Sequence, residues 1–102
     1  MRSNLTREEL LIVLIEECGE VIQAATKCLR FGFDHEQAGY GINHVQLAKE
    51  LGDILGVADG LADQFFSMRD IDAMMKNRAG KLAKVEQMNS TVQERNRVAL
   101  RG

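Results

Sequence analysis

The chain has 102 residues, of which 45% are hydrophobic, and a formal net charge of -2 at pH 7. This length fits a single domain, and the weak negative charge gives no electrostatic reason to expect nucleic acid as a partner. No segment approaches the roughly 18–20 continuous apolar residues of a membrane span, so no membrane partner is expected. The absence of Pro and Trp, with a single Tyr, favours an all-α chain over a sheet protein.

The first predicted helix covers residues 7–30. Thr6 and Glu9 have the spacing of a capping box, which predicts its start. On a helical wheel its apolar residues fall on one broad arc, and the opposite arc holds Glu16, Glu17, Glu20, Gln23 and Lys27. The three glutamates have i, i+3 and i, i+4 spacings, which bring side chains together on a helix surface. They form the first of two acidic clusters in an otherwise apolar setting.

Both cysteines lie on this first helix. Cys18 and Cys28 are ten residues apart, so at 1.5 Å per residue they lie about 15 Å apart, too far for a disulfide within the chain. We interpret them as buried, reduced thiols. No signal-peptide-like apolar segment precedes the helix, so we expect a cytoplasmic location.

Residues 31–43 are predicted to form a glycine-containing loop, and a second helix is predicted over residues 44–66. Asn43, together with Gln46, is a candidate cap for this helix. The residues Phe31, Phe33, Tyr40 and His44 are possible base-stacking groups, although the two phenylalanines fit a core or oligomer interface better.

The second helix carries the second acidic cluster. Glu50 and Asp53 stand at one border of its apolar stripe. Beyond the other border lie Asp59 and Asp63, which we interpret as solvated charges. Glycines recur at every fourth position, Gly52, Gly56 and Gly60. Such a row suggests the close approach of another helix or of a ligand, and a packing seam is the interpretation we favour.

A third helix is predicted over residues 68–89, because Ser67 and Asp70 form a second capping box. Its basic face contains Lys76, Arg78, Lys81 and Lys84. Residues 90–102 are mostly polar and are predicted to be a C-terminal tail, either a loose helix or disordered. We therefore expect an antiparallel bundle of three main helices. Because its core is thin, we expect a homodimer or homotetramer that completes the core.

The two acidic clusters predict a cation site. In antiparallel helices Glu17 and Glu20 face Glu50 and Asp53, and carboxylates that converge in this way repel one another without a cation between them. A di-iron bundle site needs Glu-x-x-His pairs, and a zinc site needs Cys or His ligands. This leaves Mg²⁺, with Mn²⁺ as an alternative, and a metal of this kind points to phosphate chemistry.

These motifs resemble those of a known family. Glu16-Glu17-Cys18-Gly19-Glu20, the helix ending Leu29-Arg30-Phe31-Gly32 and Lys49-Glu50-Leu51-Gly52-Asp53 look like the MazG-like branch of the all-α nucleoside triphosphate pyrophosphohydrolases. The resemblance covers roughly residues 5–88, so residues 1–89 are expected to be the catalytic domain. The linker between the two acidic motifs is at the long end of what this family implies.

The resemblance implies Mg²⁺-dependent cleavage of the α–β bond of a nucleoside triphosphate, giving a monophosphate and pyrophosphate. It implies Glu17, Glu20, Glu50 and Asp53 as metal ligands. Glu16 is then a supporting carboxylate that either completes the metal shell or orients the attacking water. Cationic side chains stabilise a phosphoryl transition state, and the candidates are Lys81, Lys84, Lys76, Lys27 and Arg30. Two alternatives are a phosphoribosyl-ATP pyrophosphohydrolase and a non-catalytic interaction module with a structural cation.

Overall fold

The computed structural model describes residues 3–101 of the chain. Its elements are α1 (Arg7–Phe31), β1 (Glu36–Gln37), β2 (Gly41–Ile42), α2 (Asn43–Phe65) and α3 (Met68–Arg101). The predicted all-α fold class with three main helices is confirmed, because the two strands are only two residues long and form a small hairpin within the expected loop. The chain divides into two compact units, residues 1–66 and residues 67–102. Each unit is described separately below.

Both predicted capping boxes are present, which explains why the starts of α1 and α3 agree with the sequence prediction. At α1, the Glu9 amide donates to the Thr6 hydroxyl (3.1 Å) and the Thr6 amide donates to the Glu9 carboxylate (3.0 Å). Ser67 and Asp70 make the same reciprocal pair at the start of α3, at 3.2 and 3.1 Å. Each box provides side-chain acceptors for two backbone N–H groups that have no partner within the helix.

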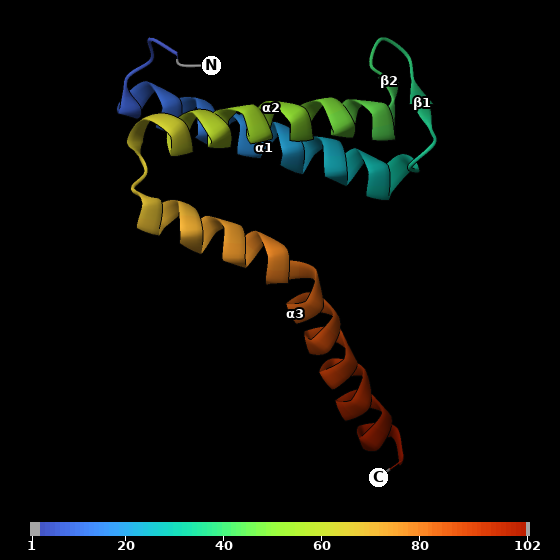
Figure 1. The fold of residues 1–102 in the computed structure, drawn as a ribbon. Coiled ribbons are helices and arrows are strands. Elements are labelled where there is room, and N and C mark those ends of the chain that lie inside the picture. Colours follow the sequence, from blue (N-terminus) through green and yellow to red (C-terminus); the bar gives the residue numbers. More distant parts are fainter. Residues whose placement is uncertain (1–2, 102) are drawn as a thin grey trace. The chain divides into compact units, whose positions relative to one another are not determined.

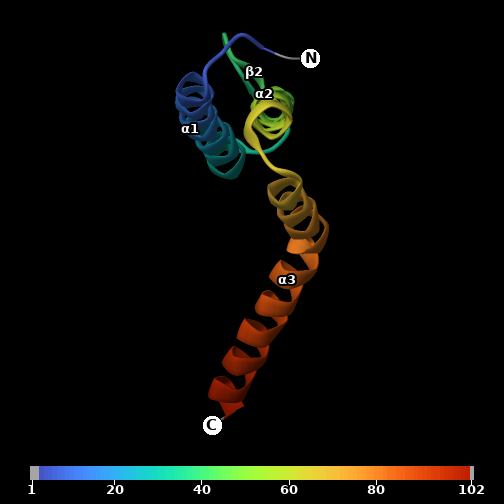
Figure 2. The same ribbon diagram turned by 60° about the vertical axis from the view of Figure 1, so that its left-hand side comes forward.

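In the first unit, α1 and α2 run antiparallel and side by side, joined at one end by the β1–β2 hairpin (Figures 1 and 2). The fully buried apolar residues of the described chain are few: Leu10, Ala24, Leu61 and Ala62. Leu10, Glu17 and Ala24 are spaced by seven residues, about two helical turns, so they form one row along α1. Glu17 is half-buried in this row. The sequence prediction that placed Glu17 on the arc opposite Leu10 is therefore wrong.

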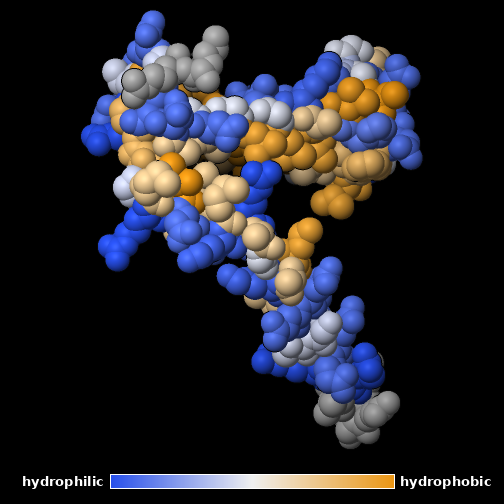
Figure 3. All heavy atoms as spheres, in the orientation of Figure 1, coloured by the Kyte–Doolittle hydropathy of each residue, from blue (hydrophilic) through white to orange (hydrophobic). Residues whose placement is uncertain are grey.

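Much of the predicted apolar arc of α1 stays in contact with solvent within the subunit. Ile15, Ile22 and Leu29 are 71%, 66% and 89% exposed, and Leu55 on α2 is 53% exposed. Figure 3 shows apolar side chains gathered along the α1–α2 pair. The apolar arc is wider than the strip that one neighbouring helix can cover, which explains the exposure. The homo-oligomer expected from the thin core stays a prediction.

Two further predictions concern burial, that of the cysteines and that of Phe31 and Phe33, which were expected in the core or in an oligomer interface. Cys18 is exposed and Cys28 is only half-buried, so neither is the buried thiol that we expected. Phe31 and Phe33 are 48% and 59% exposed and do not belong to the core. Phe33 stacks on His44 at the start of α2, with 5.0 Å between the ring centres, but this contact leaves more than half of its surface in solvent.

Asn43 does not cap α2, contrary to the sequence prediction, because no side chain makes a capping hydrogen bond at this helix start. Its side chain is instead fully buried. The Asn43 Nδ2 group donates to the Gly32 carbonyl (2.9 Å) and to the Lys27 carbonyl (3.4 Å). These carbonyls belong to the end of α1, where backbone acceptors lack helical partners. Asn43 thus ties the start of α2 to the end of α1.

The second unit is dominated by α3, which is longer than predicted. It continues as helix beyond residue 89 to Arg101, so the described part of the predicted tail is helical, and Gly102 lies outside the described residues. In the described part of the chain, no helix is both long and apolar enough to cross a membrane.

Replacing Asn43 with Ala is expected to lower the free energy of unfolding by about 1–3 kcal/mol, because the Gly32 and Lys27 carbonyls lose a buried donor. Chemical denaturation measures the change. Asn77→Ala is the matched control, because Asn77 is exposed and donates to a carbonyl of its own helix at 3.0 Å; it should change stability by less than about 0.5 kcal/mol. Equal effects of the two substitutions would contradict the tethering role of Asn43.

Candidate active site

Three of the predicted metal-ligating carboxylates meet between α1 and α2. Glu17, Glu50 and Asp53 each place one carboxylate oxygen within 4.8 Å of the others; we call these residues the acidic triad. Glu50 and Asp53 are three residues apart on α2, so they lie on neighbouring turns of one face. Glu17 reaches them from the row that α1 packs against α2. The antiparallel packing of two amphipathic helices is thus what assembles the triad.

Glu17 has the most constrained environment of the triad. It is half-buried, and one of its carboxylate oxygens has neither solvent contact nor a hydrogen-bond partner among the described residues. Burial raises the pKa of Glu17 above its usual value, and the charges of Asp53 and Glu50 raise it further. Unpaired buried anions are costly, and a cation between the three carboxylates removes both the burial cost and the repulsion.

The other two predicted acidic residues stand outside the triad. Glu16 and Glu20 are exposed on α1. Both are near enough for their charges to contribute to the raised pKa of Glu17, after the larger effects of burial, Asp53 and Glu50. The structure therefore brings together three of the four predicted metal ligands, and it leaves Glu16 and Glu20 at the edge of the group.

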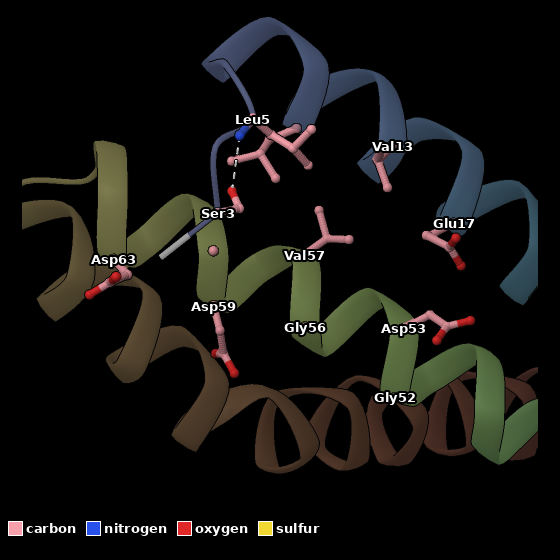
Figure 4. A pocket seen from close by; sticks show the side chains of 12 residues that line it. Ser3, Leu5, Val13, Glu17, Gly52, Asp53, Gly56, Val57, Asp59 and Asp63 are labelled. Atoms are coloured by element: carbon pink, nitrogen blue, oxygen red, sulfur yellow. Dashed lines mark hydrogen bonds between the residues drawn. The ribbon is translucent and has the colours of Figure 1, made fainter. Parts of the chain in front are cut away.

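A cleft of about 890 Å³ extends from the triad along the α1–α2 seam. Figure 4 shows Glu17 and Asp53 at one end of it and Asp63 at the other, with Val13 and Val57 between them. The cleft is thus lined by carboxylates at its ends and by apolar side chains in its middle. Binding sites for small molecules commonly have this combination and a size of about 300–1,000 Å³.

The predicted glycine row lines this cleft. A Cβ atom added at Gly52 or Gly56 meets nothing within 4 Å, and one at Gly60 meets only the Leu10 side chain, at 3.8 Å. Gly52 and Gly56 therefore form no packing seam with α1, and a seam with another subunit stays a prediction. The absence of side chains at these positions instead keeps the α2 wall of the cleft low.

The predicted phosphate-binding cations lie in different settings. The Lys27 ammonium is 3.7 Å from the centre of the Tyr40 ring, and the Arg30 guanidinium is 5.2 Å from that of Phe31. Lys76 forms an ion pair with Asp72 on the exposed surface of α3, at 2.9 Å. Lys81 and Lys84 are also exposed on α3. The structure places these three lysines in the second unit and the triad in the first.

Sequence reasoning missed two contributions to the site. Asp59 and Asp63, interpreted as solvated charges, are indeed exposed but also line the cleft. They follow Asp53 by six and ten residues on the same helix. This spacing could have predicted that they continue the line of carboxylates along α2. Tyr40 did not stand out among the loop aromatics, because its contact with Lys27 depends on how the hairpin folds back.

Comparison with known proteins identifies the domain. The sequence model of the MazG nucleotide pyrophosphohydrolase domain matches residues 5–84. The chain belongs to the MazG family. A MazG domain is a hydrolase domain that acts on nucleotide phosphoanhydride bonds. No curated protein and no solved structure matches the chain.

The MazG assignment agrees with the chemistry of the triad. Its donor set consists only of carboxylate oxygens, one of them without a partner. Hard divalent cations prefer such ligands, so the residues present fit a divalent cation. The family match ends at residue 84, and α3 continues for a further 17 residues to Arg101.

The raised pKa of Glu17 predicts a pH-dependent gain in stability for Glu17→Gln in the metal-free protein. The fold disfavours the charged carboxylate of Glu17. The resulting loss of folding stability is absent below the ordinary pKa of a glutamate and develops as the pH rises through the higher pKa of the folded state. At pH 7 the variant should therefore melt at a higher temperature than the wild type, and the gain should disappear near about pH 4. Thermal unfolding with a chelator, from acidic to neutral pH, measures this.

The control for this experiment is Glu86→Gln, which changes an exposed glutamate of α3 in the other unit. It should show no such gain at neutral pH. A melting temperature of Glu17→Gln below that of the wild type at pH 7 would show that Glu17 is stabilised, not strained, in the absence of metal.

Proposed function

We propose that the protein is a Mg²⁺-dependent nucleoside triphosphate pyrophosphohydrolase, with Mn²⁺ as an alternative metal. It cleaves the α–β bond of ribo- or deoxynucleoside triphosphates and releases a monophosphate and pyrophosphate. The observation that carries this proposal is the convergence of Glu17, Glu50 and Asp53 at the end of a cleft in a MazG domain. The catalytic domain in this proposal comprises residues 1–89, and residues 90–102 extend it.

The triad, with Glu20 as a fourth ligand, holds the cation in this proposal. A bound divalent cation neutralises phosphate charge and lowers the pKa of water. Glu16 is exposed and stands one residue before Glu17, outside the triad. This position suits a carboxylate that orients the attacking water and accepts its proton, which is the role we assign to it.

The cleft has the size and lining to hold the nucleoside. Its apolar middle, formed in part by Val13 and Val57, suits the face of a base or the carbon skeleton of a sugar. Asp59 and Asp63 can only accept hydrogen bonds when ionised, so they suit hydroxyl or amino donors on the sugar or base. With the phosphates at the triad, the substrate lies along the glycine row, where no side chain obstructs it.

Cations complete the site in this proposal. Lys81, Lys84 and Lys76 on α3, with Lys27 and Arg30 on α1, bind the phosphates and stabilise the charge that develops on them. The subunits assemble as a homodimer or homotetramer. Exposed leucines and isoleucines of α1 and α2 support this assembly, because a subunit alone leaves them in water.

The reaction is tested by measuring monophosphate and pyrophosphate release from a panel of ribo- and deoxynucleoside triphosphates with Mg²⁺, and from phosphoribosyl-ATP. Glu20→Gln and Asp53→Asn should each lower the rate at least about a hundredfold, because a lost ligand weakens charge neutralisation at the reacting phosphate. Glu86→Gln is the control and should retain wild-type activity. If the wild type released no product from any nucleotide, a non-catalytic module with a structural cation would be the better description.

The role of the basic face of α3 is tested with Lys81→Met and Lys84→Met. If these lysines bind phosphate, each substitution should raise KM or lower kcat by about tenfold, the usual loss for a charge-assisted contact of about 1.4 kcal/mol. Arg97→Met is the control, because Arg97 is exposed near the end of the same helix and pairs with Glu94 at 3.3 Å. Unchanged kinetics in both lysine variants would exclude the α3 face from the site.

A further inference from the structure

We propose that Tyr40 is a positioning residue of the active site, which holds the Lys27 ammonium beside the acidic triad and ready to bind a phosphate of the substrate. This inference rests on the proposed function and adds a specific part to it. The hairpin, residues 33–42, becomes a functional wall of the site through this contact.

The contact between the two side chains is direct. The Lys27 ammonium lies over the face of the Tyr40 ring, 3.7 Å from its centre. A cation at this distance is attracted by the electron-rich face of the ring. Lys27 belongs to none of the ion pairs formed among the described residues. Its charge is thus oriented by an uncharged group and is available to an anion.

The charges of nearby acidic residues act on Tyr40. Burial raises the pKa of its phenol, and the next largest cause is the charge of Glu50, a member of the triad. Glu20 contributes as well, after Cys28. The ring that contacts Lys27 therefore lies within electrostatic range of the triad. A lysine in an ion pair with these carboxylates would compete with the metal for them, and Lys27 forms no such pair among the described residues.

The hairpin backbone is built to place Tyr40. The residue lies between Gly39 and Gly41, whose φ angles are 76° and 97°. Side chains rarely tolerate these conformations, and a Cβ at Gly41 would come within 2.9 Å of the Gln46 amide nitrogen. The Tyr40 amide donates to the Gln37 carbonyl at 3.0 Å, which closes the turn. The two glycines and this hydrogen bond therefore fix the backbone on both sides of Tyr40.

The Lys27 backbone is also held by a hydrogen bond from Asn43. Buried Asn43 donates to the Lys27 carbonyl and to the Gly32 carbonyl. The same asparagine adjoins β2, which leads directly from Tyr40 to α2. One short segment therefore holds both the backbone and the ammonium of Lys27. This arrangement restricts the lysine far more than an exposed position on a helix does.

The test compares Tyr40→Phe, Tyr40→Leu, Lys27→Met and the double variant Tyr40→Leu/Lys27→Met in steady-state hydrolysis of the best nucleotide. Tyr40→Phe keeps the ring and should stay within about twofold of the wild type. Tyr40→Leu and Lys27→Met should each raise KM about three- to tenfold with a smaller effect on kcat, the range expected for a lost cation–ring contact. The double variant should be no worse than Lys27→Met, because both changes remove one shared interaction.

Phe66→Leu is the matched control. Phe66 is an aromatic residue, 41% exposed, that follows the last residue of α2, at the opposite end of this helix from the hairpin. Its replacement should leave KM unchanged. The proposal is overturned if Tyr40→Leu leaves KM unchanged, if Phe66→Leu raises KM equally, or if the two single effects multiply in the double variant.

A binding measurement separates this proposal from the proposed function. Calorimetric titration of the Mg²⁺-loaded protein with inorganic tripolyphosphate requires no turnover. Affinity should fall in Tyr40→Leu and Lys27→Met and be retained in Tyr40→Phe and Phe66→Leu. If the wild type hydrolyses no nucleotide but shows this pattern, the proposed function fails and the role of Tyr40 stands. Equal affinity in all variants overturns the role of Tyr40 whatever the hydrolysis assay shows.

Discussion

Repulsion between carboxylates within the α1–α2 seam is the constraint on which the first unit depends. Glu17 occupies the position in the packed row between Leu10 and Ala24 where an apolar residue is expected, and it meets Glu50 and Asp53 there. The seam therefore stores unfavourable electrostatic energy in the absence of a cation. Burial of the small apolar core, Leu10, Ala24, Leu61 and Ala62, offsets this energy. Repulsion within the triad thus opposes the packing of α1 on α2 that brings the triad together.

Several uncharged residues near the triad hold its surroundings in place. The glycine row keeps the cleft open beside the triad. The Tyr40 ring contacts the Lys27 ammonium, which forms no ion pair among the described residues. Asn43 fixes the junction of α1, the hairpin and α2 through buried hydrogen bonds that carry no charge. Neutral groups position the charged ones, which leaves the carboxylates and the ammonium free for ligands.

Local interactions made much of the fold predictable from the sequence. Capping boxes and apolar periodicity give the start of α1 and its end to within one residue, as well as the start of α3. Packing direction was not predictable, because an apolar arc wider than one helix contact does not say which part faces the partner. For this reason the sequence pattern placed Glu17 on the wrong side, and it did not find the buried role of Asn43 or the contact between Tyr40 and Lys27. The spacing of Glu50 and Asp53 predicted that these two carboxylates lie together, because an i, i+3 pair shares one face of a helix in any packing. Glu20 has the same spacing from Glu17 but stays outside the triad.

The position of Glu17 in the row with Leu10 and Ala24 has a consequence for how this protein can change. A leucine at position 17 would complete an apolar row, remove a half-buried charge and abolish the triad. Selection for heat resistance alone would favour that change, whereas selection for turnover would oppose it. Stability and activity therefore place opposite demands on the residue at position 17. In a variant of this protein that melts at an unusually high temperature, position 17 is the first place to look for a substitution.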